Sequence, residues 1–313
     1  MSSRRDRSST ALRPLALSQG LLSRADGSAQ FSFGNVAVLG SVTGPAEVRI
    51  RDELVDRATL EINVRPLRGQ GGPGIKAIEA TLTSLLTPLI LLHLYPRALL
   101  QLTLQTVSSP STAFSIPTST DPLLNAGKGK GKAIPPPPRG VAIAASERAA
   151  TINAAMMALV DAGVQCRGML VAVAVAFLPS RTNASQTADE AEEEEMILDP
   201  SPAEEDQATS THVFAFLFGV GVGGTEGTCV SIDAVGTFTE DQLYDAQDLA
   251  QSAAQTVLAF IRRSVETKYG AESGPAPAIT RPQQAEVEEK PMVEGSSAEE
   301  DDDEDDDKVM IDA

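Results

Sequence analysis

The sequence is poor in cysteine and histidine, the residues that build disulfide frameworks, metal clusters and hydrolytic triads. It contains two of each among 313 residues. Cys166 and Cys229 lie in apolar, strand-like contexts, where a small buried thiol is the expected role, so we predict no disulfide framework and no metal cluster. His93 and His212 have no partnered serine or cysteine nearby, which argues against a hydrolase with a catalytic triad.

Long apolar runs are also missing. No run reaches the roughly 18 residues that a membrane span requires. The amino-terminal residues 1–14 are charged and lack the apolar core of a signal peptide. We therefore expect a soluble, intracellular protein that does not enter a membrane.

The acidic composition comes from two short segments. The formal net charge is −18, but residues 189–206 contain 10 acidic and no basic residues, and residues 283–313 contain 14 acidic and 2 basic ones. The rest of the chain therefore carries a net charge of +4. A mildly basic body is compatible with an RNA partner.

Several segments have compositions that do not support a packed core. Residues 108–140 combine Ser, Thr and Pro with a GKGKGK repeat and four consecutive prolines, residues 179–195 are polar and increasingly acidic, and residues 271–313 are Pro-rich and then acidic. We predict disorder in these segments and in residues 1–11. A single α/β domain over residues 12–270, with two insertions, remains.

The clearest structural signal lies between residues 151 and 177. From Ile152 to Val160, apolar residues follow the i, i+3, i+4 spacing of a helix with one buried face. Gly163 ends this helix, because glycine adopts the left-handed conformation of a helix stop without steric cost. The continuously apolar stretch Leu170–Phe177 then predicts a strand that is covered on both faces.

The other patterns predict pairs of strands separated by packed helices, which indicates an α/β or α+β fold with a mixed sheet. Pro88 should kink or break its helix near Thr87, and Thr239 with Gln242 forms a capping box. The glycines of residues 219–224 suit a hairpin turn better than a phosphate loop, because no helix follows them. The predicted strands are 21–34 with 36–42, 57–65, 98–107, 213–222 and 227–235, and the other predicted helices are 75–95 and 240–268.

Four phrases of the sequence carry a family resemblance. They are LLSRADGSAQFSFGNVAVLGSVTGPAEV at 21–48, ATLEINVRP at 58–66, LYPRALLQLTLQTV at 94–107 and INAAMMALVDAG at 152–163. They resemble the RNase PH fold, and in particular the RNase PH-like ring subunits of the eukaryotic RNA exosome of the catalytically silent type with a short ADGS hairpin. The resemblance implies a ribosomal-S5-domain-2-like topology with two βαβα-type halves and mixed sheets. It also implies a six-membered ring around an RNA channel, capped by S1/KH subunits.

Active members of the resembled family hold inorganic phosphate at a Gly-Gly-Thr-Arg turn at the start of a helix, where N–H groups and the helix dipole favour an anion. The matching residues here are Ala145, Ser146, Glu147 and Arg148. The arginine is kept, but the glycines are lost and Glu147 places a negative charge where the anion would lie. The preceding helix carries only Lys76 where active relatives have several basic residues. Phosphate should therefore bind poorly.

The resemblance also implies a pair of acidic metal ligands, which could correspond to Asp199 with Glu205 or Asp206. A lone LDP followed by acidic residues is equally typical of a solvated loop, and we favour that interpretation. We predict no metal and no cofactor. Arg148, Asp199 and Asp206 are interpreted as vestiges of a catalytic site.

Candidate RNA contacts are basic residues of two loops. Arg65 and Arg68 precede a Gly-rich loop that faces the channel in the resembled ring subunits, so they either contact RNA or form ordinary surface charge. Lys128, Lys130 and Lys132 either solubilise a linker or make sequence-independent contacts with RNA phosphates.

Taken with the resemblance, these features predict a non-catalytic structural subunit of the exosome core ring. Such a subunit threads RNA to a nuclease on another chain during 3′-to-5′ RNA degradation and processing, including rRNA processing. The expected partners are other RNase PH-like ring subunits, S1/KH cap subunits and RNA, and the expected locations are the nucleus, nucleolus and cytoplasm. The alternative is an active phosphate-dependent 3′-to-5′ exoribonuclease, or a metal-dependent nuclease that uses Asp199 and Asp206.

Overall fold

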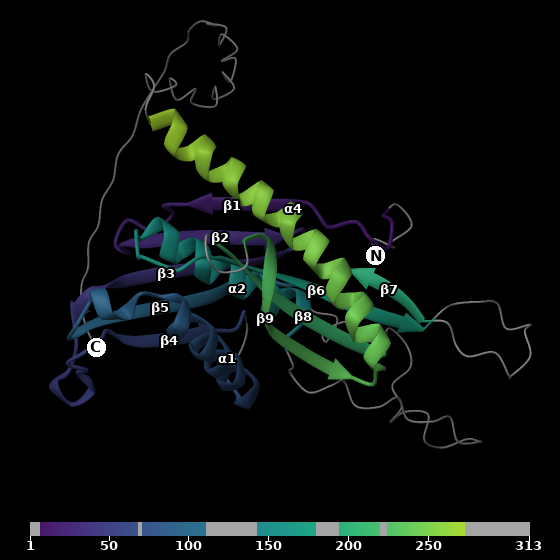
Figure 1. The fold of residues 1–313 in the computed structure, drawn as a ribbon, viewed down its shortest axis with the longest axis horizontal. Coiled ribbons are helices and arrows are strands. Elements are labelled where there is room, and N and C mark those ends of the chain that lie inside the picture. Colours follow the sequence, from purple (N-terminus) through teal and green to yellow (C-terminus); the bar gives the residue numbers. More distant parts are fainter. Residues whose placement is uncertain (1–6, 68–70, 111–142, 180–193, 220–223, 273–313) are drawn as a thin grey trace, which may run out of the picture.

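The computed structural model describes residues 7–67, 71–110, 143–179, 194–219 and 224–272, which form two β-sheets and their covering helices (Figure 1). The strands are β1 (Leu15–Gln19), β2 (Gly27–Phe33), β3 (Val36–Glu47), β4 (Thr59–Arg65), β5 (Ala98–Ser108), β6 (Met169–Pro179), β7 (Glu194–Leu198), β8 (Ser210–Gly219) and β9 (Gly224–Gly236). The helices are α1 (Pro73–Leu89), α2 (Ala145–Asp161), α3 (Pro202–Glu205) and α4 (Glu240–Glu272), with short 3-10 turns at Ile50–Asp52 and Leu92–Leu94.

The two sheets differ in strand direction. The first has the order β1-β2-β3-β5-β4 and is antiparallel except for β4 and β5, which are parallel and joined by the crossover helix α1. The second has the order β7-β6-β8-β9 and is antiparallel throughout. The parallel pair of the predicted βαβ unit therefore occurs once among the described residues, in the amino-terminal half.

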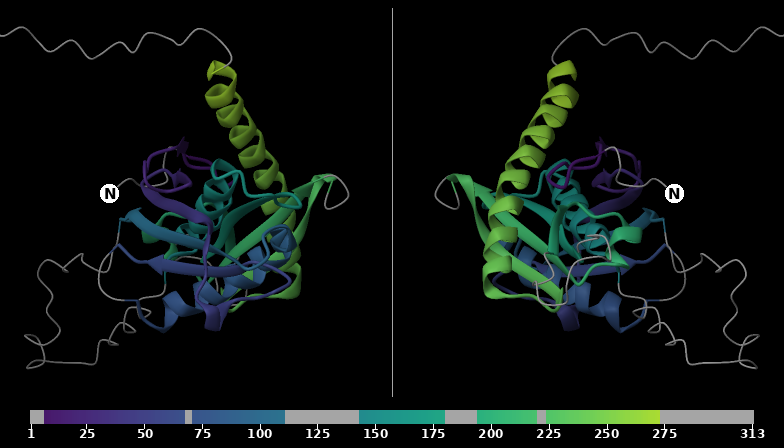
Figure 2. Two further views of the ribbon diagram at one scale, coloured as in Figure 1. Left: turned by 90° about the vertical axis from the view of Figure 1, so that its left-hand side faces the viewer. Right: turned by 90° about the vertical axis from the view of Figure 1, so that its right-hand side faces the viewer.

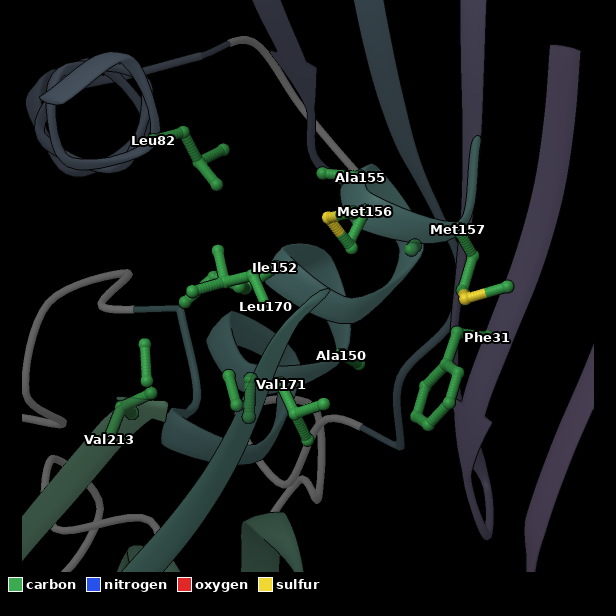
Figure 3. Packing of buried hydrophobic residues seen from close by; sticks show 14 of the residues in the cluster. Phe31, Leu82, Ala150, Ile152, Ala155, Met156, Met157, Leu170, Val171 and Val213 are labelled. Atoms are coloured by element: carbon green, nitrogen blue, oxygen red, sulfur yellow. The ribbon is translucent and has the colours of Figure 1, made fainter. Parts of the chain in front are cut away.

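Helix α2 lies between the two sheets and forms the centre of the core (Figure 3). Figure 3 shows Met157 beside Phe31 of β2 on one side of the helix, with Val171 of β6 and Val213 of β8 on the other side. Almost every residue from Ala145 to Leu159 is buried, which is the pattern of a helix enclosed on all sides. The apolar face predicted from the sequence is therefore only part of the buried surface.

Two glycines allow α2 to lie close to the first sheet. A Cβ atom at Gly40 of β3 would stand 2.8 Å from the carbonyl oxygen of Ala154, and one at Gly27 of β2 would stand 2.2 Å from the Ala162 nitrogen. Both distances are shorter than a carbon atom can tolerate, so these positions require glycine.

Helix α4 covers the outer face of the second sheet (Figure 2). Its buried residues recur at helical spacing, for example at Ala246, Ala250 and Val257. The predicted capping box is confirmed: the Thr239 N–H donates to Gln242 Oε1 at 2.8 Å, and the Gln242 N–H donates to Thr239 Oγ1 at 3.4 Å. No helix in the described part of the chain is long and apolar enough to cross a membrane.

The predicted fold class, a mixed α/β architecture, is confirmed, and so is the helix stop at Gly163, which has a φ of 69°. The glycines at 219 and 224 face each other across the β8–β9 hairpin, as predicted. The break expected near Thr87 is found two residues later: α1 ends at Leu89, one residue after Pro88, and Leu92–Leu94 forms a separate 3-10 turn.

Three short elements were not predicted from the sequence: β1, β7 and α3. Several domain boundaries also differ from the expected ones. Residues 7–11 are placed against the body, Ser108 and Pro179 end strands β5 and β6, and Glu194 begins β7. The remainder of the predicted insertions, the residues before Arg7 and the acidic tail from residue 273 lie outside the described residues.

Candidate functional site at the start of helix α2

The amino terminus of helix α2 is the position of the predicted vestigial phosphate site. The N-cap residue is Ala144, whose side chain cannot accept a hydrogen bond. The carboxylate of Glu205 accepts the first N–H groups instead: the Ala145 N–H donates to Oε2 at 2.6 Å and the Ser146 N–H donates to Oε1 at 3.0 Å. A negative charge is favourable at this end of a helix dipole. Glu205 therefore occupies the place that an external anion would take.

The short helix α3 brings Glu205 to this position. Pro202 lies in its first turn, and the Ser201 N–H donates to the Glu204 carboxylate at 2.8 Å, which fixes the start of the helix. Burial raises the pKa of Glu205, whereas the N–H groups of Ser146 and Ala145 and the charge of Arg148 act to lower it. Glu205 is thus a buried carboxyl group whose acceptor atoms are already used within the chain.

Glu147 does not lie where the sequence analysis placed it. Its carboxylate points to strand β5, where it accepts a hydrogen bond from Thr106 Oγ1 at 2.7 Å, and both residues are buried. The expectation that Glu147 fills the anion position is therefore wrong. The reason is geometric: the side chain at the third helical position reaches the first sheet, and Glu205 reaches the helix end from the other side.

Arg148 is present, but its side chain is already paired with an acidic residue. Its guanidinium forms an ion pair with the carboxylate of Asp233 on β9. The two side chains lie in a small crevice whose α1 wall consists of Ile78, Thr81 and Leu82. No basic residue of α1 lines this crevice, and Lys76 is exposed elsewhere on the helix. The crevice therefore offers little attraction to a phosphate group.

Asp199 is enclosed by two arginines rather than by solvent. It is 1% exposed and has a φ of 48°, and its carboxylate accepts bonds from Arg13 Nε at 2.8 Å, Arg13 Nη2 at 2.5 Å and the Arg13 main-chain N–H at 2.9 Å. Arg7 adds an ion pair at 3.7 Å. A bidentate guanidinium satisfies a buried carboxylate well. The expected solvated loop is therefore wrong for both Asp199 and Glu205.

The three acidic residues considered as metal ligands have three different environments. Asp199 is paired with arginine and Glu205 with the end of α2, while Asp206 is exposed at the end of α3. Among the described residues, no group of three or more His, Cys, Asp or Glu side chains is arranged to hold a metal ion.

The predicted RNA contacts are represented in the structure by one residue. Arg65 ends strand β4 and is exposed. Arg68, Lys128, Lys130 and Lys132 lie outside the described residues.

The histidine and cysteine residues do not form a second site. Contrary to expectation, His212 does have a serine partner: its Nε2 lies 3.0 Å from Ser210 Oγ. Both residues are fully buried, burial lowers the pKa of His212, and no acceptor bonds its Nδ1, so the pair belongs to the core. Cys166 and Cys229 are free and half-buried, and burial raises the pKa of Cys166 to about 11, which keeps that thiol protonated and unreactive.

Comparison with known proteins identifies the family. Residues 11–165 match the RNase PH family, described as 3′ exoribonuclease family, domain 1. The exosome complex component RRP46 of Saccharomyces cerevisiae is 30% identical over 247 residues, which cover 79% of this chain and 93% of the yeast protein. The chain belongs to the RNase PH family. The Schizosaccharomyces pombe exosome complex component rrp46 is 32% identical over 148 residues, 47% of this chain and 51% of that protein.

A solved structure confirms the fold of this RNase PH family member. The crystal structure of rice (Oryza sativa) Rrp46 superposes with a TM-score of 0.62 at 24% sequence identity, covering 83% of this chain and 98% of the rice chain. The match covers both sheets of the described residues, so the predicted fold is confirmed for the carboxy-terminal half as well.

The residues that close the site were not predicted from the sequence. Arg13 and Asp199 are 186 positions apart, so no local pattern connects them. One signal could have indicated the role of Glu205. An alanine at the N-cap leaves the first N–H groups of α2 without a local acceptor, which requires an acceptor from elsewhere.

Proposed function

We propose that this RNase PH family member is a non-catalytic structural subunit of the RNA exosome core ring. It would support 3′-to-5′ RNA degradation and processing by helping to thread RNA to a nuclease on another chain. Other RNase PH-like ring subunits, S1/KH cap subunits and RNA are its proposed partners, and the nucleus, nucleolus and cytoplasm its proposed locations. The similarity to proteins named exosome complex components supports the membership.

The proposal that the protein is non-catalytic depends on one observation: the Glu205 carboxylate accepts hydrogen bonds from the Ala145 and Ser146 N–H groups. Phosphorolysis requires inorganic phosphate at a helix start of this kind, and a resident carboxylate excludes it by charge and by volume. The ion pairs Arg148–Asp233 and Arg13–Asp199 support the same proposal, because each engages a side chain that an active site would need free.

The alternative functions have less support. For phosphorolysis, Arg148 would have to break its ion pair with Asp233, and the Glu205 carboxylate would have to move away from the amino terminus of α2. A metal-dependent nuclease would require Asp199 to exchange a bidentate guanidinium for a cation.

The purified full-length chain should release no nucleoside diphosphate from a single-stranded RNA 3′ end in the presence of inorganic phosphate, with an active phosphorolytic enzyme as positive control. Phosphorolysis that disappears in Arg148→Ala would overturn the proposal. Membership is tested separately: the endogenous protein should co-purify with RNase PH-fold and S1/KH chains, identified by mass spectrometry.

A further inference from the structure

We infer that residues 7–13 form a latch that holds helix α3, and with it Glu205, against the start of α2. The inference rests on the proposed function, because it concerns what keeps the start of α2 closed in a non-catalytic subunit. It goes beyond that proposal by assigning the closure to a distant segment of the chain. Release of the latch would leave the amino terminus of α2 open to an anion.

The latch connects the first sheet to the strand that leads into α3. Figure 1 shows the chain before β1 running toward β7. On the side of the first sheet, the Gly34 N–H donates to the Pro14 carbonyl at 2.8 Å. The Arg13 stem lies against the same glycine, because a Cβ atom at Gly34 would stand 3.1 Å from Arg13 Cδ. On the side of the second sheet, the Leu198 N–H of β7 donates to the Ser9 carbonyl at 2.8 Å.

Asp199 is the residue through which the latch holds the turn before α3. Arg13 donates to both of its carboxylate oxygens, from Nε at 2.8 Å and from Nη2 at 2.5 Å. Arg7 Nη2 donates to the Asp199 main-chain carbonyl at 3.0 Å and forms an ion pair with Glu204 of α3 at 3.7 Å. The Arg13 and Arg7 side chains are only 11% and 19% exposed, so solvent screens these contacts less than it screens surface ion pairs.

The turn between Asp199 and α3 is stiff enough to transmit a movement to Glu205. Asp199 has a φ of 48°, a conformation that a residue other than glycine keeps only where the surrounding contacts impose it. Pro200 and Pro202 have ring-fixed φ angles, so the turn has little freedom to absorb a displacement. A buried carboxylate without its cation is strongly unfavourable. If Asp199 lost Arg13, its carboxylate would therefore move toward water, and α3 would move with it.

The latch is held by polar contacts more than by apolar packing. Ser8 and Thr10 are exposed, and Leu12 is the latch residue that packs, partly buried, against the hydrophobic core. A segment with few buried apolar contacts opens at a lower free energy than the core does. The latch can therefore be released while both sheets stay folded, which distinguishes it from a structural part of the core.

The first test measures anion binding by the full-length chain. Arg13→Met removes the bidentate partner of Asp199 and keeps an apolar stem. Lys268→Met is the matched control, because it removes an aspartate ion pair at the other end of α2. With the ionic strength held constant by potassium chloride, inorganic phosphate should raise the thermal midpoint of Arg13→Met by about 3–6 °C, the shift expected at about ten times the dissociation constant. The wild type and Lys268→Met should not respond.

The second test measures amide hydrogen exchange at the helix end. In Arg13→Met, the Ala145 and Ser146 amides should exchange about tenfold faster than in the wild type, because Glu205 no longer accepts their hydrogen bonds. Exchange in the buried strand β6 should change much less, whereas a general loss of stability would accelerate both. Arg7→Met keeps the Arg13 pair and should show the same two responses to a smaller extent. It supplies the measurement if Arg13→Met does not fold.

The double variant Arg13→Met/Glu205→Ala shows whether the latch acts through Glu205. It should respond to phosphate to the same extent as Glu205→Ala alone. A larger response would mean that phosphate binds elsewhere than at the start of α2, and the inference would be wrong. It would also be wrong if Arg13→Met and Arg7→Met showed neither response while Glu205→Ala bound phosphate, and the proposed function would then stand. If Glu205→Ala itself did not respond, the closed helix end would no longer support the proposed function, and the latch would have nothing to hold.

Discussion

The two ends of helix α2 are both held by a carboxylate, with opposite consequences. At the amino terminus, Glu205 from α3 accepts the N–H groups of Ala145 and Ser146. At the carboxyl terminus, Asp161 of the helix itself accepts the Ser28 N–H at 2.9 Å and binds Lys268 Nζ at 2.5 Å. One contact fills a site that could bind a ligand, and the other ties α2 to β2 and α4.

The helix dipole explains the difference. A carboxylate at the amino terminus is stabilised by the partial positive charge of the free N–H groups, so it competes directly with any anionic ligand. A carboxylate in the last turn faces partial negative charge and needs other partners. Lys268 and the buried Ser28 N–H supply them. The same chemical group therefore blocks binding at one end and joins elements at the other.

Glu205→Ala should have the largest effect. It leaves two buried N–H groups without an acceptor, so the free energy of unfolding should fall by about 2–4 kcal/mol in urea titration. The emptied helix end should then accept an anion. Added inorganic phosphate should raise the thermal midpoint of Glu205→Ala and leave that of the wild type unchanged.

Asp206→Asn is the matched control, because Asp206 is the next residue and is exposed. It should change the stability by no more than about 0.5 kcal/mol and show no response to phosphate. If Glu205→Ala were as stable as Asp206→Asn, the carboxylate at the helix end would not be the group that closes the site.

The fold could be predicted because its signals are local. Gly163 as helix stop, the Thr239–Gln242 capping box and the buried run of β6 each depend on residues a few positions apart. Of the missed elements, β1 and β7 have five residues each and lack such signals. Helix α3 has only four residues, but it carries two local signals that were overlooked, Pro202 in its first turn and the capping box of Ser201 and Glu204.

The candidate site could be located but not described. The loss of the phosphate turn is visible at residues 145–148, yet the group that replaces phosphate comes from residue 205 and the partner of Asp199 from residue 13. A sequence of acidic residues looks solvated when considered alone. Burial reverses this interpretation, because an enclosed carboxylate requires a donor, and only the folded chain shows which donor is near.

Asp161→Ala should have a smaller effect than Glu205→Ala, about 1–2 kcal/mol, because its Lys268 partner is partly exposed and screened by solvent. Lys268→Met removes only the ion pair and should cost less than about 1 kcal/mol. Neither variant should respond to phosphate. A phosphate response in Asp161→Ala would show that anions stabilise the protein elsewhere than at the start of α2.

The smallest expected effect is a pH dependence of the stability difference between the wild type and Glu205→Gln. Burial raises the pKa of Glu205 from its ordinary value of 4.5, so as the pH falls the folded protein takes up this proton before the unfolded chain does. The wild type should therefore gain stability relative to Glu205→Gln as the pH is lowered from 7 toward 4.5, and this gain should be complete below the unfolded pKa. Urea titrations of both proteins at several pH values measure the difference. A difference that instead moved against the wild type on acidification would mean that the two N–H groups and Arg148 outweigh burial, and that the carboxylate holds the helix end more strongly when ionised than its burial alone implies.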